Sequence, residues 1–166
     1  MITGMKITSV GMPTEILSGR GLAAPIRLAL TEAIEVWHGK MLPRHFRGGA
    51  AERYGYRPRK AATVKRKYRF AAATGNYEAR LPLVWTGRLR RMVTSAVCVT
   101  TSRAKGRGHL RAPGYAHMYS RGGNRPYLAG EVLTVIDDEA EALGRVVEWT
   151  LTALLNGNRR RRVLRV

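Results

Sequence analysis

The chain of 166 residues carries 30 Lys and Arg against 11 Asp and Glu, which gives a formal net charge of +19. A chain of this length buries one hydrophobic core, and its hydrophobic content of 45% excludes wholesale disorder. No apolar run approaches the roughly 18 residues of a membrane span, and the N-terminal segment lacks the apolar stretch of a secretory signal. We therefore expect a single folded domain with no membrane partner.

The positive charge indicates a negatively charged partner, because the cations of a free monomer repel one another and attract polyanions. Nucleic acid would neutralise it, and so would acidic protein neighbours in an assembly. The charge alone does not separate these two classes of partner.

The first predicted helix covers residues 22–42. Its apolar residues recur every three or four positions, as a buried helix face requires: Leu22, Ile26, Leu30, Ile34, Trp37 and Met41. Pro25 falls in the opening turn, where a missing N–H is tolerated, and Pro43 is expected to end the helix.

A second helix is predicted from Asp138 to about Leu155. Asp138 stands at the expected N-cap with Glu141 three residues later, which resembles a capping box. The expected buried face consists of Ala140, Leu143, Val147, Leu151, Leu154 and Leu155. Asn156-Gly157 supplies an ordinary helix end.

Strands are expected at residues 6–10, 93–101, 109–118 and 131–136, where apolar and polar residues partly alternate. Cys98, the single cysteine, is expected to be a small buried residue of the second of these strands. We predict an α+β fold, with a mostly antiparallel sheet of about four strands packed by two long helices. The domain would span residues 1–157 and be followed by an Arg-rich C-terminal tail at 158–166.

Residues 43–82 interleave many Lys and Arg with tyrosines and are interrupted by Gly-Gly, Arg-Pro and Thr-Gly-Asn breakers. A helix is expected only at about residues 60–72. The rest is predicted to be a long basic loop or arm, and long basic loops in small domains usually contact a partner.

Catalytic chemistry has no candidate constellation in the sequence, so we expect no enzyme, no cofactor and no metal site. The four histidines have no metal-ligand spacing, and there is no nucleophile elbow or phosphate-binding loop. His38 is expected to serve packing or an interface. The acidic run that begins at Asp137 suits the positive end of a helix dipole without any ion. The basic, aromatic arm leaves single-stranded nucleic-acid binding as an alternative function.

Residues 82–93 read Pro-Leu-Val-Trp-Thr-Gly-Arg-Leu-Arg-Arg-Met-Val. This segment resembles the Pro-Leu-x-x-Thr-Gly-x-Leu-Arg-x-Ser-Ile signature of tailed-phage neck proteins, with Met92-Val93 in place of Ser-Ile. These proteins are the head–tail joining or tail-completion family, which is related to Mu-like virion morphogenesis proteins. The order of the long helix, the basic region and the later Tyr- and Gly-rich residues 115–128 is also similar to that family. Thr86 is expected to cap a short segment at residues 88–92, with Leu89 as its anchor.

This resemblance implies a structural virion protein that forms a ring in the neck and joins head to tail. The ring would be a hexamer, with a dodecamer as the alternative, assembled in the host cytoplasm. Its neighbours would be other neck, portal-adaptor, stopper or tail-tube proteins, with packaged DNA nearby. From the basic arm, the signature and the tail, we expect subunit or partner contacts at Arg44, Arg47, Arg53, Tyr54, Tyr56, Arg57, Lys65, Arg66, Tyr68, Trp85, Thr86, Gly87, Arg88, Leu89, Arg90, Arg91, Arg159 and Arg160.

Overall fold

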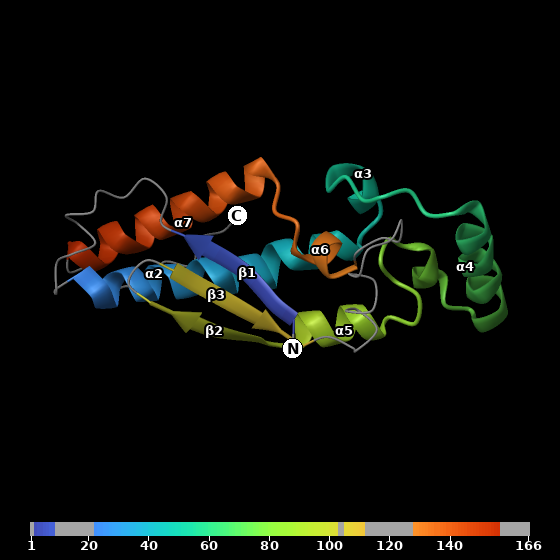
Figure 1. Cartoon of the computed structure of the whole chain (residues 1–166), viewed down its shortest axis with the longest axis horizontal. Coiled ribbons are helices and arrows are strands. Elements are labelled where there is room, and N and C mark those ends of the chain that lie inside the picture. The colour runs from blue at the N-terminus through green and yellow to red at the C-terminus, as the bar shows by residue number, and fades with distance from the viewer. Residues whose placement is uncertain (1, 9–21, 103–104, 112–127, 157–166) are drawn as a thin grey trace.

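Helix α2 (Ala23–Val36) runs through the middle of the molecule (Figure 1). The computed structural model describes residues 2–8, 22–102, 105–111 and 128–156. Ile26, Leu30 and Ile34 are buried, as the spacing of the apolar residues predicts. The helix continues without a break through a π-helical turn η2 (Trp37–Met41) and a 3-10 turn η3 (Leu42–Phe46). Pro43 does not end it, because proline fits the first turn of η3.

The residues that the structure describes are mostly helical, so the predicted α+β class is wrong. After η3 follow α3 (Ala50–Arg53), α4 (Ala61–Thr74), the 3-10 turn η4 (Tyr77–Arg80) and α5 (Arg88–Ser95). Helices α6 (Leu128–Leu133) and α7 (Asp137–Leu155) come last in the described part of the chain. The segment 43–82, predicted to be largely loop, is therefore largely helical.

The strands form one small antiparallel sheet in the order β1-β3-β2. Strands β2 (Val97–Thr101) and β3 (Lys105–Leu110) are a hairpin, and β1 (Ile2–Thr8) pairs with the other side of β3. The predicted strand at 93–101 begins only at Val97, since residues 93–95 belong to α5. The predicted strand at 131–136 is wrong, because α6 covers its first half. Of the predicted strand at 109–118, residues 109 and 110 lie in β3, and residues 112–118 lie outside the described residues.

Two glycines bring the sheet against α2. A Cβ atom at Gly106 would lie 2.9 Å from Ile34 Cδ1, and one at Gly108 would lie 2.9 Å from Ile34 Cγ2. Side chains therefore do not fit between β3 and the helix. The opposite face of the same strands points outward and carries exposed side chains, namely Cys98, Thr100, Lys105 and Arg107. The prediction that Cys98 is buried is wrong.

Helix α7 packs beside α2 with a buried face that differs from the predicted one (Figure 1). Its buried residues are Glu139, Leu143, Val146 and Thr150. Thr150 Oγ1 donates a hydrogen bond of 3.1 Å to Glu32 Oε2 of α2. The N-cap is Ile136 and makes no side-chain hydrogen bond, so the predicted capping box at Asp138 is wrong. The helix itself, and its end at Leu155, are confirmed.

Candidate partner-binding surface

A buried polar cluster fixes the start of the basic segment to α7. His45 of η3 stacks on the ring of Tyr54 at a centroid distance of 3.8 Å. The Tyr54 hydroxyl donates a hydrogen bond of 2.6 Å to Glu139 Oε1, and the Tyr56 hydroxyl lies 2.7 Å from His45 Nδ1. These side chains are less than a tenth exposed, so the cluster is structural and holds the chain in place before α4.

Burial changes the acid–base properties of this cluster. It lowers the pKa of His45 from 6.5 to about 4, mainly through desolvation of the imidazolium. His45 Nδ1 lies 3.2 Å from the Glu131 carbonyl oxygen, whereas Nε2 has no partner among the described residues. Protonation would therefore bury an unpaired N–H. Burial, together with neighbouring carboxylates, raises the pKa of Tyr54 and of Tyr56.

An ion pair holds the next stretch of chain. Arg59 Nη1 donates to Glu131 Oε1 at 3.1 Å, and Arg59 Nη2 donates to the second oxygen of the same carboxylate. The backbone N–H of Arg57 reaches Glu131 Oε1 at 3.3 Å. Because Glu131 lies on α6, this forked contact joins the chain entering α4 to the C-terminal part of the molecule.

Helix α4 and the turn η4 form the far end of the molecule (Figure 1). The guanidinium of Arg80 lies 5.0 Å from the Tyr68 ring centroid and 4.9 Å from that of Tyr77. Both tyrosines are more than half exposed. On the inner side, the Arg66 guanidinium lies 4.9 Å over the Trp85 ring. Cations and aromatic rings therefore alternate across this end.

Lys67 attaches α4 to the chain that follows η4. Its Nζ donates a hydrogen bond of 2.6 Å to the Leu81 carbonyl. Burial lowers the pKa of Lys67, and the nearby charge of Arg59 acts in the same direction.

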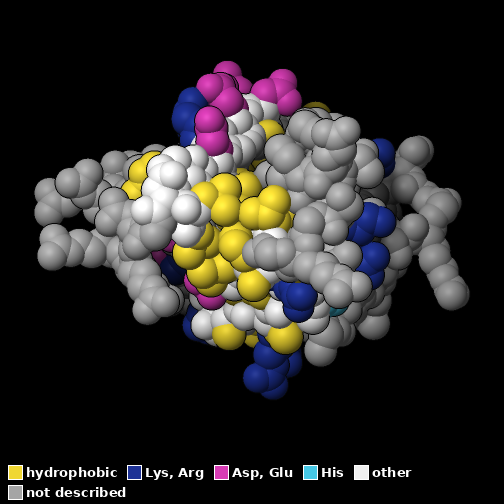
Figure 2. All heavy atoms as spheres, turned by 90° about the vertical axis from the view of Figure 1, so that its left-hand side faces the viewer, with side chains coloured by type: hydrophobic (Ala, Val, Ile, Leu, Met, Phe, Trp, Pro, Cys, Tyr) yellow, Lys and Arg dark blue, Asp and Glu magenta, His cyan; other side chains and the backbone are white. Residues whose placement is uncertain are grey.

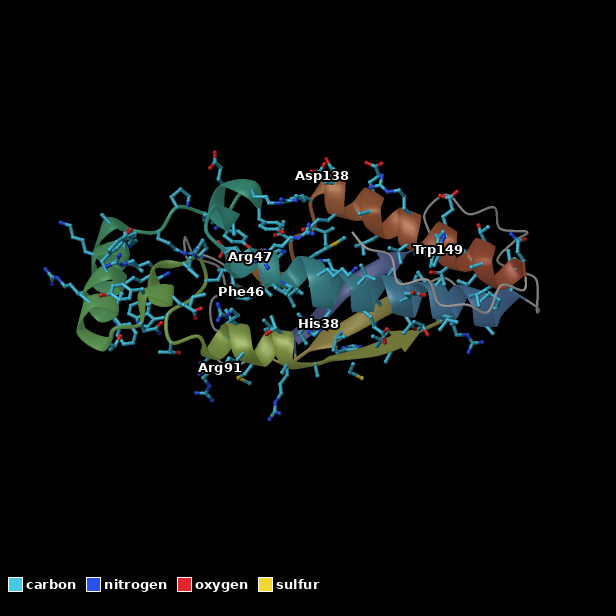
Figure 3. The ribbon with its side chains drawn as sticks, turned by 180° about the vertical axis from the view of Figure 1, so that it is seen from behind. His38, Phe46, Arg47, Arg91, Asp138 and Trp149 are labelled. Atoms are coloured by element: carbon cyan, nitrogen blue, oxygen red, sulfur yellow. The ribbon has the colours of Figure 1, made fainter. Side chains whose placement is uncertain are left out.

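The signature segment forms the turn into α5. Gly87 has a φ of 75°, which glycine adopts without strain, and is the N-cap of the helix. The backbone N–H of Arg88 lies 3.4 Å from Thr86 Oγ1, and Leu89 and Val93 are buried. Leu89 anchors this short segment as expected, but the N-cap of α5 is Gly87 without a side-chain cap hydrogen bond, so the predicted cap at Thr86 is wrong. Arg91 is exposed on α5, and its Nη1 donates a hydrogen bond of 3.4 Å to the Thr86 carbonyl oxygen (Figure 3).

His38 connects α5 to the long helix. Its Nε2 lies 2.9 Å from the Val93 carbonyl oxygen. Figure 3 shows His38 in the region between the central helix and α5. His38 is half-buried and contacts α5, and packing was one of the two roles expected for it.

The structure divides the residues predicted to contact a partner into buried, half-buried and exposed ones, apart from two that it does not describe. Tyr54, Tyr56, Gly87 and Leu89 are buried, and Arg44, Trp85 and Arg90 are half-buried. Arg159 and Arg160 lie outside the described residues. The exposed members are Arg47, Arg53, Arg57, Lys65, Arg66, Tyr68, Thr86, Arg88 and Arg91. Tyr77 and Arg80 are not among the predicted contacts, although their spacing of three suits a 3-10 turn that presents both side chains on one side.

Charge is segregated along the molecule. Residues 40–91 hold fifteen Lys and Arg but only two acids, Glu52 and Glu78, and Glu78 pairs with Arg90 at 2.9 Å. The acids of α7 gather instead at the edge of the molecule shown at the top of Figure 2, where Figure 1 places that helix. Figure 2 also shows apolar side chains at the end where α2 begins, where Leu28 and Leu155 are 46% and 60% exposed.

Comparisons with known proteins find no family model, no curated protein and no solved structure that matches this chain. Within the described ranges, no group of three or more His, Cys, Asp or Glu side chains could hold a metal ion. The helices that the structure describes include none long and apolar enough to cross a membrane.

Proposed function

We propose that this protein is a structural component of a tailed-phage virion that forms a ring in the neck and joins head to tail. It acts as a homo-oligomer, a hexamer or a dodecamer, beside neck, portal-adaptor, stopper or tail-tube proteins. Assembly takes place in the host cytoplasm and needs no enzymatic activity. The observation that carries the proposal is the resemblance of residues 82–93 to the neck-protein signature.

The form of this segment supports the proposal. Gly87 makes a turn that ordinary residues would enter only with strain, and Leu89 anchors α5 in the core. Arg88 and Arg91 are exposed on the same short helix. The signature thus combines a fixed core anchor with outward cations, as a contact between subunits requires.

The surplus of exposed cations supports the same function. Arg47, Arg53, Arg88 and Arg91 form no ion pair with a carboxylate of the described residues. A monomer would carry this charge against its own repulsion, whereas an assembly places it beside acidic neighbours.

The test is to delete the gene from the phage genome that carries it and to image the particles by negative-stain electron microscopy. We expect filled heads and separate tails that do not join, and joined particles when the gene is supplied in trans. Joined, infectious particles in the deletion strain would contradict the proposal.

Free nucleic-acid binding remains the second candidate, because exposed Tyr68 and Tyr77 lie beside Lys and Arg. Its test is the salt dependence of binding to a single-stranded oligonucleotide. Release of counterions predicts that the affinity falls steeply as salt rises. Weak binding that hardly changes with salt would count against this candidate.

A further inference from the structure

The outer face of α4 lacks the cover that a helix of this length needs. Only Ala71 of its 14 residues is buried. Isolated helices of about 12–15 residues are marginal in water, and most helical stability in proteins comes from a packed face. The outer face instead exposes Val64 and Tyr68, which are 39% and 52% exposed. Tyr77 of η4 is 63% exposed and shares the Arg80 guanidinium with Tyr68.

The chemistry of this face suits a protein better than a nucleic acid. Val64 offers nothing to phosphates or bases, and Arg80 covers one face of each tyrosine ring. Tyrosine and arginine around an apolar centre are the residues enriched in protein interfaces. Lys65 and Arg69 are exposed on the same helix and form no ion pair with a described carboxylate. The partner surface should therefore be acidic.

The chain itself carries an acidic surface of this kind. Helix α7 exposes Asp137, Asp138, Glu141 and Glu148, and Arg145 is its only base. Helix α4 lies at the opposite end of the elongated molecule from most of α7 (Figure 1). Because α4 is also tied down by Lys67 and Arg66, its outer face cannot turn onto α7 of the same chain.

We propose that the outer face of α4 and η4 docks on the acidic face of α7 in a second copy of this chain. The inference rests on the proposed function, for which it supplies the contact between neighbouring subunits. The two surfaces differ, so the contact is head-to-tail, and a bound pair still has one free surface of each kind. Repetition of such a contact closes a ring when the rotation between copies allows it.

The experiment compares neutral variants of the two faces in the full chain. One variant carries Lys65→Gln and Arg69→Gln, and the other carries Glu141→Gln and Glu148→Gln. We expect the wild type to form oligomers at low salt in sedimentation velocity, and each variant to self-associate about tenfold more weakly. An equimolar mixture should contain dimers as its largest species, because only one intact contact remains for each pair.

A matched control removes the same charge elsewhere. Lys105→Gln with Arg107→Gln lies on the exposed face of β3 and should leave self-association unchanged. Circular dichroism melting of each variant checks that it folds. If the control weakens association as much as the α4 variant, the effect is one of net charge, and the proposed contact is overturned.

Two further results would overturn the contact. One is a wild-type chain that stays monomeric at low salt, and the other is an α4 variant that loses oligonucleotide binding but associates normally. Failure of the proposed function looks different. If the chain associates through these faces but is absent from purified virions, the contact stands and the neck assignment fails. If the chain is present in virions but the variants of both faces associate as the wild type does, the neck assignment stands and the contact fails.

Discussion

His45 makes the stability of this protein depend on pH. The folded chain holds the imidazole neutral, with its pKa lowered from 6.5 to about 4 by burial. Above pH 6.5 both the folded and unfolded chains are neutral at this residue. As the pH falls below 6.5, His45 becomes protonated in the unfolded chain but stays neutral in the folded chain. The free energy of unfolding should therefore fall between pH 6.5 and 4, by about 3 kcal/mol in total from this residue.

The measurement is the slope of the unfolding free energy against pH, from urea titrations of the wild type and of His45→Gln. The carboxylates titrate in both proteins, so the difference between the slopes belongs to His45. Equal slopes for the wild type and His45→Gln would contradict the assignment.

Tyr54 is the hydrogen-bond donor to one oxygen of a buried carboxylate. Its hydroxyl lies 2.6 Å from Glu139 Oε1, and Glu139 Oε2 has no partner among the described residues. We expect Tyr54→Phe to lower the free energy of unfolding by about 1–3 kcal/mol, because it leaves the carboxylate without this donor. Tyr68→Phe removes an equivalent hydroxyl from an exposed ring and should change stability little. Chemical denaturation checks both, and equal effects would show that the buried hydrogen bond is not what matters.

These same residues show what sequence reasoning at the level of single positions can and cannot reach. The basic context of Tyr54 and Tyr56 favoured a surface role, yet both rings lie in the polar cluster. Their partners, His45, Glu131 and Glu139, come from distant parts of the chain, and no local pattern reveals that meeting. The prediction for Cys98 is wrong for the opposite reason. Its small apolar side chain predicted burial, but side chains along β2 alternate between the two faces of the sheet, and Cys98 lies on the outward face.

The packing of the sheet on α2 depends on the glycines of β3. A Cβ at Gly108 would lie 2.9 Å from Ile34 Cγ2 and 3.2 Å from Val97 Cγ2. Gly108→Ala should therefore push the hairpin off the helix and lower the free energy of unfolding by about 1–3 kcal/mol. Gly144→Ala is the control, because open space surrounds that position on α7. It should raise stability by about 0.5–1 kcal/mol through helix propensity. Thermal and urea unfolding measure both, and a neutral Gly108→Ala would contradict the close approach.

Long elements with a strong apolar period were predictable, and short ones were not. In α2 and α7 the apolar residues recur every three or four positions over many residues, so the pattern indicates a helix and not a strand. Residues 93–95 and 131–133 are rich in β-branched or apolar side chains and favoured strands, but both stretches are helical because they pack as short helices against the core. That error turned a helical fold with a small sheet into a predicted α+β fold. The turn at Gly87 was readable because Thr-Gly before a Leu-anchored run is a local signal.

At the scale of the whole molecule, the sequence shows where the charges lie along the chain but not how far apart they lie in space. The basic run of residues 40–91 and the acids of α7 are both visible in the sequence. The basic helix α4 and most of the acidic helix α7 lie toward opposite ends of an elongated molecule, because α7 runs back along α2 (Figure 1). The orientation of α4 depends on contacts such as Lys67 to Leu81, which no periodicity encodes. The candidate surface therefore required the structure.

This segregation makes the effect of a charge on stability depend on its position. Arg69 lies among cations on α4, whereas Arg145 lies among acids on α7 and pairs with Glu141 at 2.5 Å. Arg69→Gln should raise the melting temperature at low salt, and Arg145→Gln should lower it, each by the equivalent of about 0.5 kcal/mol.

Added NaCl should raise the melting temperature of the wild type, because repulsion dominates at a net charge of +19 and salt screens it. Melting curves at low protein concentration, where self-association is negligible, measure all three effects. A wild-type melting temperature that falls with NaCl would show that attraction between segregated charges outweighs repulsion within the basic half.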